Sequence, residues 1–340
     1  MDIKSMYLTE LESFLKEKGY PTFRAKQLYQ WLHEKHVGSL DDMTNIPKTM
    51  KEDIKEAGFV TIEEETRQES AKDGTIKFLY RMQDGQMIET VFMRYSYGNS
   101  ICISSQAGCR MGCKFCASTI GGLIRNLTAS EMLEQVYMTM RLTGERISNI
   151  VVMGTGEPLD NYDNVLRFLS LITDEQGQNM SMRHISLSTC GVVPGIYDLM
   201  EKDLQLTLSV SLHAPSDEIR SSMMPVNRKW NVDELLTACR KYTDKTRRRI
   251  SFEYAMVSGV NDSDDCARLL AKKLRGILCH VNLIPVNEVK ETGCKRSSRE
   301  RIESFSHILE KSGFAVTVRR KLGSDINASC GQLRRSNKKQ

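Results

Sequence analysis

Residues 101–116, ICISSQAGCRMGCKFC, join a short apolar segment to three closely spaced cysteines. Cys109, Cys113 and Cys116 have the spacing C-x3-C-x2-C, and the loop supplies no fourth ligand of its own. A structural zinc site normally takes four ligands, so zinc would need one from far along the chain, such as His184. Three thiolates are better suited to a 4Fe-4S cluster that leaves one iron atom open to a substrate or cofactor.

The segments after residue 100 alternate between strand and helix patterns. Those with the apolar character of strands are 101–106, 149–154, 184–191, 206–214, 250–259 and 281–287. Helical patterns separate them, so we expect an α/β fold, namely a partial (β/α) barrel over residues 96–320. A doubly wound open sheet is the alternative, because spacing does not fix strand order. In a barrel the reactive side chains lie at the carboxyl ends of the strands.

The rest of the chain divides into smaller parts. Residues 1–60 contain three amphipathic helical patterns and predict a small helical accessory domain. Residues 61–95 contain two alternating segments separated by Gln83-Asp84-Gly85, which predicts a β-hairpin linker. Residues 321–340 form a C-terminal loop with a basic tail.

Glu89 lies in the second strand of the expected hairpin, on the same side as Met87, Val91 and Met93. A carboxylate on an apolar face is costly unless it is paired, and such burial is how proteins prepare a general base. The alternative is a strand whose hydrophobic face lies on the other side, with Ile88 and Phe92 inward. The pattern alone leaves both interpretations open.

The composition is that of a globular protein, with 40% apolar and 27% charged residues. Apolar runs stay below the roughly 18 residues that a membrane helix needs, and the first residues lack the apolar core of a secretion signal. We therefore expect a cytoplasmic protein that does not enter a membrane. In that reducing compartment its ten cysteines are expected to serve metal, redox or nucleophilic chemistry, or packing.

The positive charge is concentrated near the C-terminus. The chain has a net charge of +5, and residues 290–340 hold 13 Lys and Arg against 5 Asp and Glu. Residues 240–249, RKYTDKTRRR, add a second basic run. Such patches suit a nucleic-acid backbone, although a solvated surface is an equally good interpretation of charge alone.

Several motifs together carry a family resemblance. The three-cysteine loop CRMGCKFC, with Phe115 before its last cysteine, resembles the radical S-adenosylmethionine (SAM) signature. The segments CISSQAGC, MGTGEPL, LSTCGVVP, SLHAP, NLIPVN and GSDINASCGQL extend the likeness over almost the whole length. Together they resemble the RlmN/Cfr family of ribosomal RNA adenine methyltransferases, and QAGC with GEPL is more similar to the RlmN branch.

The resemblance implies two cofactors, a 4Fe-4S cluster and SAM, with two SAM molecules used per turnover. Cys109, Cys113 and Cys116 would hold the cluster. The residues expected to bind SAM are Gly156 and Glu157 at its amino group, and Ser188, Ser211, Leu212, His213 and Asn287 around the rest of it. Two departures from the family pattern are Cys190, where serine is common, and Glu288 after Asn287, where proline is usual.

The resemblance also implies how the methyl group travels. One SAM methylates Cys330, and a second SAM starts the radical transfer of that carbon to the adenine through a transient bond between protein and RNA. Glu89 would then remove the ring proton. Cys102 would release the product and end in a disulfide with Cys330.

The implied substrate is 23S rRNA at carbon 2 of an adenine in the peptidyl transferase centre, with a tRNA adenine beside the anticodon as a second substrate of some members. The helical domain 1–60, with Arg24 and Lys26, and the basic C-terminal part would bind the RNA backbone. A low-potential donor such as flavodoxin would supply electrons, and we expect a monomer. The alternative within the family is methylation at carbon 8, as in the Cfr branch. Outside it, a non-enzymatic RNA-binding protein with a zinc site predicts no SAM cleavage, and a ferredoxin-like carrier would need a fourth cysteine.

Overall fold

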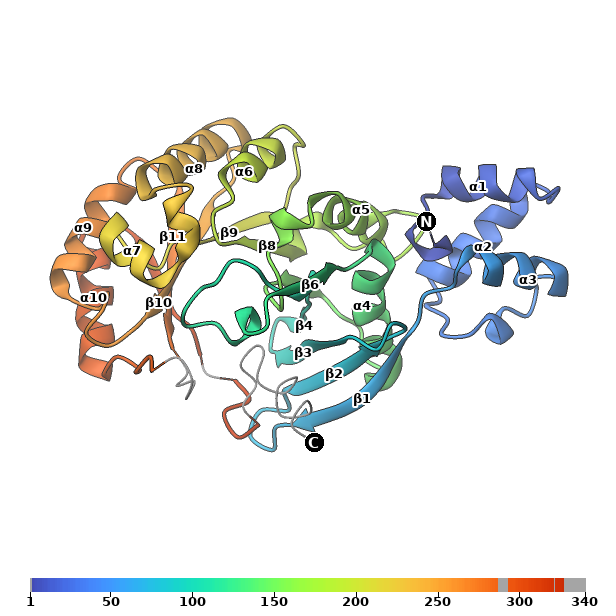
Figure 1. Cartoon of the computed structure of the whole chain (residues 1–340), viewed down its shortest axis with the longest axis horizontal. Helices are drawn as coiled ribbons and strands as arrows, with labels where there is room; N and C mark the ends of the chain where they lie inside the picture. The colour runs from blue at the N-terminus through green and yellow to red at the C-terminus, as the bar shows by residue number, and fades with distance from the viewer. Residues whose placement is uncertain (1, 287–292, 321, 327–340) are drawn as a thin grey trace.

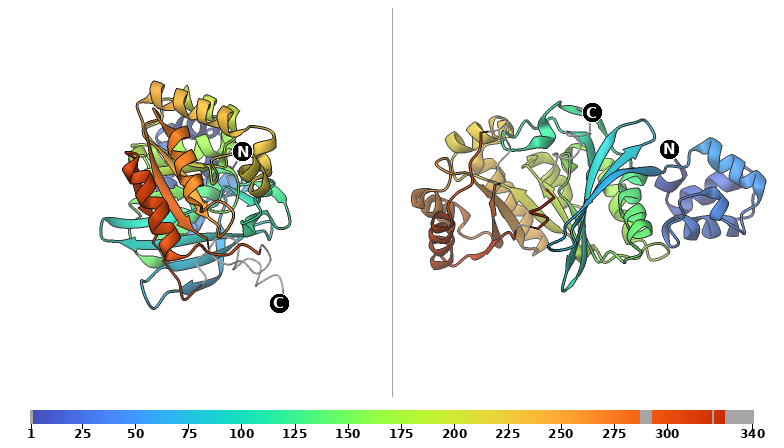
Figure 2. Two further views of the ribbon diagram at one scale, coloured as in Figure 1. Left: turned by 90° about the vertical axis from the view of Figure 1, so that its left-hand side faces the viewer. Right: turned by 90° about the horizontal axis from the view of Figure 1, so that it is seen from below.

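The computed structural model describes residues 2–286, 293–320 and 322–326 (Figure 1). Within them, ten strands form one continuous sheet with the order β1-β2-β3-β4-β7-β8-β9-β10-β11-β12. The sheet is curved, with helices on its outer side and the N-terminal helices displaced to one end (Figures 1 and 2).

One part of the sheet is parallel and runs in chain order. Its strands are β4 (Gly98–Cys102), β7 (Asn149–Val152), β8 (Ile185–Thr189), β9 (Thr207–Ser211), β10 (Ile250–Met256), β11 (Cys279–Pro285) and β12 (Ala315–Val318). Each pairs in parallel with the next. This sequential order confirms the predicted partial barrel and excludes the doubly wound alternative, in which the strand order reverses at a switch point. Strand β12 was not predicted, because it is short and largely exposed.

Helices connect the parallel strands and cover the outer face of the sheet (Figure 1). They are α4 (Ala129–Thr143), α5 (Tyr162–Thr173), α6 (Val193–Met200), α7 (Asp217–Met223), α8 (Val232–Thr246), α9 (Asp264–Leu274) and α10 (Arg299–Lys311). Helix α4 begins with a capping box made by Thr128 and Glu131 and ends at Gly144 in the left-handed conformation. Among the described residues, no helix is long and apolar enough to cross a membrane.

The antiparallel part of the sheet comprises β1 (Ile62–Glu69), β2 (Ile76–Met82) and β3 (Met87–Tyr95), and β3 pairs antiparallel with β4. The hairpin expected around Gln83-Asp84-Gly85 is β2–β3. It continues the main sheet rather than forming a separate linker. Strand β1, IEEETRQE, was not predicted, because its charged side chains lack the alternation of a half-buried strand.

The N-terminal residues fold into η1 (Ile3–Ser5), α1 (Leu8–Glu17), α2 (Phe23–His33) and α3 (Lys48–Ala57). Their apolar faces enclose a small core that is continuous with the main one. Its fully buried side chains include Leu11, Leu15, Leu28, Leu32 and Ile54.

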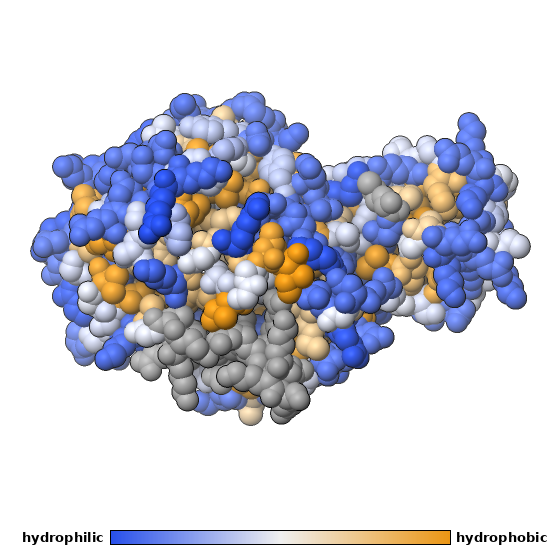
Figure 3. Space-filling view, in the orientation of Figure 1, coloured by the Kyte–Doolittle hydropathy of each residue, from blue (hydrophilic) through white to orange (hydrophobic). Residues whose placement is uncertain are grey.

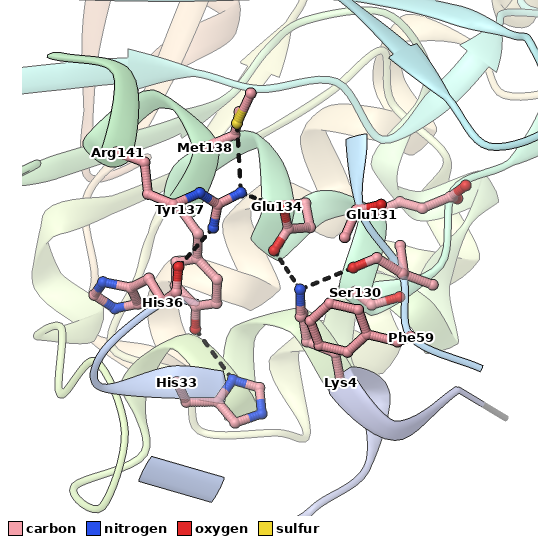
Figure 4. A network of polar contacts seen from close by, with 12 residues as sticks. Lys4, His33, His36, Phe59, Ser130, Glu131, Glu134, Tyr137, Met138 and Arg141 are labelled. Atoms are coloured by element: carbon pink, nitrogen blue, oxygen red, sulfur yellow. Dashed lines mark hydrogen bonds and ion pairs between the residues drawn. The ribbon is translucent and has the colours of Figure 1, made fainter. Parts of the chain in front are cut away.

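A buried network of charges fixes these helices to α4 (Figure 4). The Lys4 ammonium lies 2.5 Å from Glu134 Oε1 and donates to the Val60 carbonyl at 2.8 Å. Arg141 donates to the second oxygen of Glu134 at 2.7 Å and to the His36 carbonyl at 2.7 Å. Because buried charges are costly without partners, this network tolerates few other geometries and holds the accessory helices in one position.

His33 is the buried titratable group of the same interface. Its ring is fully buried between Tyr29 and Tyr137, and its Nδ1 lies 3.2 Å from the Tyr137 hydroxyl. Burial lowers the pKa of His33 to about 3, and the positive charge of Lys4 adds to the effect. The ring is therefore neutral at physiological pH.

We predict that His33 makes the protein less stable in acid. The unfolded chain takes up a proton on His33 below its ordinary pKa of about 6.5, whereas the folded protein does so only near pH 3. The neutral ring therefore makes its whole contribution to the free energy of unfolding above pH 6.5. This contribution falls by about 1.4 kcal/mol per pH unit as the pH decreases from 6.5 towards 3. Urea unfolding of wild type and His33→Gln between pH 7 and 4 measures this slope. An equal slope in both proteins would contradict the assignment.

Candidate active site

The cysteine loop lies inside a two-stranded hairpin formed by β5 (Gln106–Gly108) and β6 (Leu123–Asn126), with the short helix η3 (Ala117–Thr119) between them. The Cys109 amide donates to the Gly122 carbonyl at 3.0 Å, and the Lys114 amide donates to the Met223 carbonyl of α7 at 2.9 Å. The loop is therefore tied at its base to the hairpin and at its tip to the end of α7.

Gly108 permits the loop to turn back on itself. Its φ is +87°, and a Cβ there would lie 2.1 Å from the Gly122 carbonyl oxygen. Only glycine allows both the left-handed backbone and this close approach.

The three cysteines line one cavity of about 600 Å³. Cys109 and Cys113 are buried, and Cys116 is partly buried. Burial raises the pKa of the Cys109 thiol to about 11 and raises that of Cys113 further, with the neighbouring thiols adding to both effects. Iron binding must therefore displace thiol protons.

The donor set fits a 4Fe-4S cluster, because thiolates are the ligands that such clusters use. Among the described residues, no three His, Cys, Asp or Glu side chains converge as ligands of one metal ion. A four-iron cluster distributes its thiolates over different iron atoms, so its ligands lie further apart than those of zinc.

Glu157 forms part of the cavity wall at the carboxyl end of β7. Its carboxylate is buried and accepts the Leu159 amide at 3.0 Å and the Cys190 amide at 2.7 Å. Burial raises the pKa of Glu157, although the two amides oppose the shift. The preceding Gly156 has a φ of +117°, and a Cβ there would lie 2.7 Å from Gln106 Cβ. The fixed carboxylate suits a cationic ligand group, which would favour its ionised form.

His213 closes the cavity beside the cysteine loop. Its ring meets Phe115 edge to face with the centroids 4.9 Å apart, and its Nδ1 accepts the Ala255 amide at 2.9 Å. Burial lowers the pKa of His213 to about 3, and Arg220 adds to the effect. His213 is therefore a neutral, fixed wall residue.

The structure brings most of the predicted site residues together. Those that line the cavity are Cys102, Cys109, Cys113, Cys116, Gly156, Glu157, Ser188, Ser211 and His213. Leu212 is fully buried in the main core and is not among the lining residues. Asn287 and Cys330 lie outside the described residues.

Glu89 is buried and lies next to this cavity rather than on its wall. The neighbouring Val91 and Met93, two and four residues along on the same face, form an apolar cluster with Cys102, and Val91 pairs directly with Cys102. Ile88 and Phe92 point the opposite way into the main core. The strand is thus covered on both faces, and the catalytic role expected for Glu89 stays a prediction.

Lys77 is a partner of Glu89 that the sequence analysis missed. Its ammonium lies 2.9 Å from the Glu89 carboxylate, and both side chains are buried. The residue belongs to β2, so only the pairing of β2 with β3 brings it to Glu89. A lysine within the alternating segment IKFLYRM was the only local signal for it.

Glu253 is a second residue that the sequence analysis missed. It lines the cavity from β10 and accepts the Ser251 hydroxyl at 2.9 Å and the Asn282 side-chain amide at 2.7 Å. Burial raises the pKa of Glu253, and these donors oppose the shift.

The disulfide that the resemblance implies between Cys102 and Cys330 is not supported by the structure. Cys102 is buried in the apolar cluster with Val91 and Met93, and its expected partner Cys330 lies outside the described residues. The pairing therefore remains an implication of the resemblance.

This fold and cysteine loop define a radical SAM enzyme, and the comparisons agree. The profile of the Radical SAM superfamily matches residues 103–270, and that of the ribosomal RNA large subunit methyltransferase N-terminal domain matches residues 1–60. A crystal structure of a radical SAM methyltransferase from Sphaerobacter thermophilus has a TM-score of 0.93 and 44% identity, covering 98% of each chain.

The chain belongs to the RlmN family of radical SAM RNA methyltransferases. It is 55% identical to a Clostridium botulinum protein named "Probable dual-specificity RNA methyltransferase RlmN", over 97% of this chain and 95% of that protein. A Lachnoclostridium phytofermentans protein of the same name is 52% identical over 99% of this chain and 95% of its own length. Membership implies SAM and a 4Fe-4S cluster as cofactors and RNA as substrate.

We predict that Gly108→Ala disrupts the cysteine loop. The left-handed backbone and the contact with Gly122 together should lower the free energy of unfolding by about 2–5 kcal/mol and reduce bound iron. Gly121→Ala is the matched control, because Gly121 also has a positive φ but no atom lies within 4 Å of its Cβ position. Chemical unfolding and iron assays of both variants measure the difference, and equal iron contents would contradict the prediction.

We predict that Lys77→Met destabilises the protein by about 3–5 kcal/mol, because it takes an ammonium away from a buried carboxylate. The double variant Lys77→Met/Glu89→Gln should recover most of this loss. Lys245→Met is the control, since Lys245 and Glu201 form an exposed pair worth less than about 1 kcal/mol. Urea unfolding tests all three, and similar losses in Lys77→Met and Lys245→Met would show that the buried pair is unimportant.

Proposed function

We propose that this enzyme methylates carbon 2 of an adenine in 23S rRNA, and of a tRNA adenine beside the anticodon, through a methylated Cys330. The observation that carries the proposal is the composition of the cavity wall. One cavity is lined by the three-cysteine loop, by Cys102 and by Leu322–Ser324, the segment that leads to Cys330. The predicted cofactor ligands and the chain segment of the methyl carrier thus meet in one place.

In this proposal Cys109, Cys113 and Cys116 hold the cluster, and Glu157 receives the amino group of SAM. The bound cluster and SAM supply the radical chemistry, with two SAM molecules consumed per turnover. Ser188 at the end of β8, with Ser211 and His213 at the end of β9, completes the pocket, while Leu212 supports it from the core. The role of Asn287 remains a prediction.

Such chemistry is required because carbon 2 of adenine is an electron-poor sp² centre that does not attack a sulfonium methyl group. Once the carbon is attached, the ring still carries a proton that must leave. We assign its removal to the Glu89 carboxylate, which Lys77 orients, and the release of the product to the Cys102 thiol. In this scheme Glu89→Gln should accumulate the covalent protein–RNA adduct.

The mouth of the cavity suits an RNA substrate. Arg296, Arg319 and Arg320 are exposed and line it, which favours a phosphate backbone. Figure 3 shows hydrophobic surface at the centre of the face seen in Figure 1, over the region of β6. Ile124 of β6 and the nearby Ile120 are exposed. An adenine swung out of its stack would meet both kinds of surface. Flavodoxin as donor, a monomeric state and a cytoplasmic location complete the proposal.

The test combines product analysis with peptide analysis. Enzyme purified anaerobically with its iron is incubated with isotopically labelled SAM, a 23S rRNA fragment containing the peptidyl transferase loop, and bulk tRNA. We expect 2-methyladenosine in both RNAs and a labelled methyl group on Cys330 in the tryptic peptide 322–334. Both signals should vanish in Cys330→Ala and persist in Cys266→Ala, whose thiol lies outside the cavity.

The possible results separate the parts of the proposal. Formation of 8-methyladenosine would assign the reaction to carbon 8. RNA methylation by Cys330→Ala would overturn the methyl-carrier role. Product in rRNA alone would remove tRNA as a substrate.

A further inference from the structure

The loop 70–75, which joins β1 to β2, binds the C-terminal segment 322–326 through two aspartates. The Gly323 amide donates to Asp73 Oδ2 at 2.8 Å. In the opposite direction, Asp325 accepts the Ser70 hydroxyl at 2.6 Å and the Ala71 amide at 3.0 Å. We call the contacts among Ser70, Ala71, Asp73, Gly323 and Asp325 the aspartate clamp. Each side contributes one carboxylate and one amide, so the contact is reciprocal.

The loop side of the clamp is organised by its own hydrogen bonds. The Ser70 hydroxyl oxygen accepts the Lys72 amide at 3.2 Å and the Asp73 amide at 3.3 Å. Asp73 Oδ1 accepts the Thr75 amide at 3.0 Å, which leaves Oδ2 for the other segment. The loop therefore presents its acceptor and its donors in a fixed arrangement, which lowers the entropy cost of holding the second segment.

The C-terminal side is held at a second point. Leu322 packs against the apolar cluster of Val91, Met93 and Cys102. Beyond it, the Ile326 amide donates to the Gly323 carbonyl at 3.2 Å and closes a turn. One apolar contact and one polar clamp thus fix residues 322–326 on the face of the sheet that carries Cys102.

We propose that Asp73 and Asp325 are positioning residues for Cys330. Cys330 follows Asp325 by five residues, so even a fully extended chain keeps it within about 18 Å of the clamp. The clamp therefore sets the point from which the methyl carrier is delivered to the cavity. This inference rests on the proposed role of Cys330 and adds the contact that limits how far Cys330 can lie from the cavity.

The clamp is tested in the full-length holoenzyme with Asp73→Asn and Asp325→Asn. In each variant one clamp acceptor oxygen becomes an amide donor. We expect hydrogen exchange in peptides covering residues 70–75 and 322–326 to become about tenfold faster, as for the loss of one charge-assisted hydrogen bond. This readout does not depend on activity. Asp265→Asn is the control, because its carboxylate is highly exposed and lies on α9.

The functional readout is the ratio of two products of the enzyme, 5'-deoxyadenosine and methylated adenine. We expect both variants to methylate Cys330 about tenfold more slowly, while SAM cleavage measured without RNA continues at the wild-type rate. The amount of 5'-deoxyadenosine formed per methylated adenine should therefore rise. Thermal unfolding of each variant, and of Ser70→Ala as a milder change, identifies any loss due to misfolding.

Each outcome decides a separate point. RNA methylation by Cys330→Ala would overturn the proposed function itself. If Cys330→Ala is inactive but both aspartate variants show wild-type exchange, the clamp does not form. Hydrogen exchange could instead become faster while Cys330 methylation and the ratio of 5'-deoxyadenosine to methylated adenine stay unchanged. That result would show that the clamp forms but does not position Cys330, and it would overturn the inference.

Discussion

Parallel pairing of strands in chain order is the constraint on which the site depends. Because β4 and β7 to β11 run in one direction, their carboxyl ends meet at one edge of the curved sheet. The cysteine loop follows β4, Glu157 follows β7, and Ser211 ends β9. Cys109 and Ser211 are about a hundred positions apart in the sequence, yet both line one cavity. No local segment could assemble such a pocket, so its integrity depends on the whole parallel array.

Two sets of buried ion pairs hold parts of this framework in place. Lys77 of β2 allows Glu89 of β3 to be buried beside the cavity. At the opposite end of the sheet's antiparallel part, Lys4 and Arg141 share Glu134 and fix the accessory helices to α4. Such pairs add little stability relative to apolar packing, but they are expensive to break. Their effect is on position: the first pair fixes the Glu89 carboxylate, and the second joins the accessory helices to α4.

The sequence predicted the elements whose side chains carry their own pattern. The parallel strands β4 and β7 to β11 were predicted because each has buried apolar residues at regular positions between two helical segments. The edge strands β1 and β12 were missed, since pairing of their backbones rather than a hydrophobic alternation defines them. The same limit applied to the site. The cysteine spacing was visible as a local motif, whereas Lys77 and Glu253 became site residues only through pairing across strands.

The sequence by itself determined the cysteine loop, the succession along the chain of strands β4 and β7 to β11 with their helices, and the family, because each is carried by short contiguous motifs. It also singled out Glu89, since a carboxylate among apolar residues is visible along one strand. Only the tertiary structure decided that Lys77 forms an ion pair with Glu89 and that the loop 70–75 forms hydrogen bonds with residues 323–325. The two sides of that clamp are about 250 positions apart, and a hydrogen bond acts over about 3 Å. A contact of such short range between residues so far apart in the sequence produces no local pattern of residue types. It can therefore be recognised only in the folded structure.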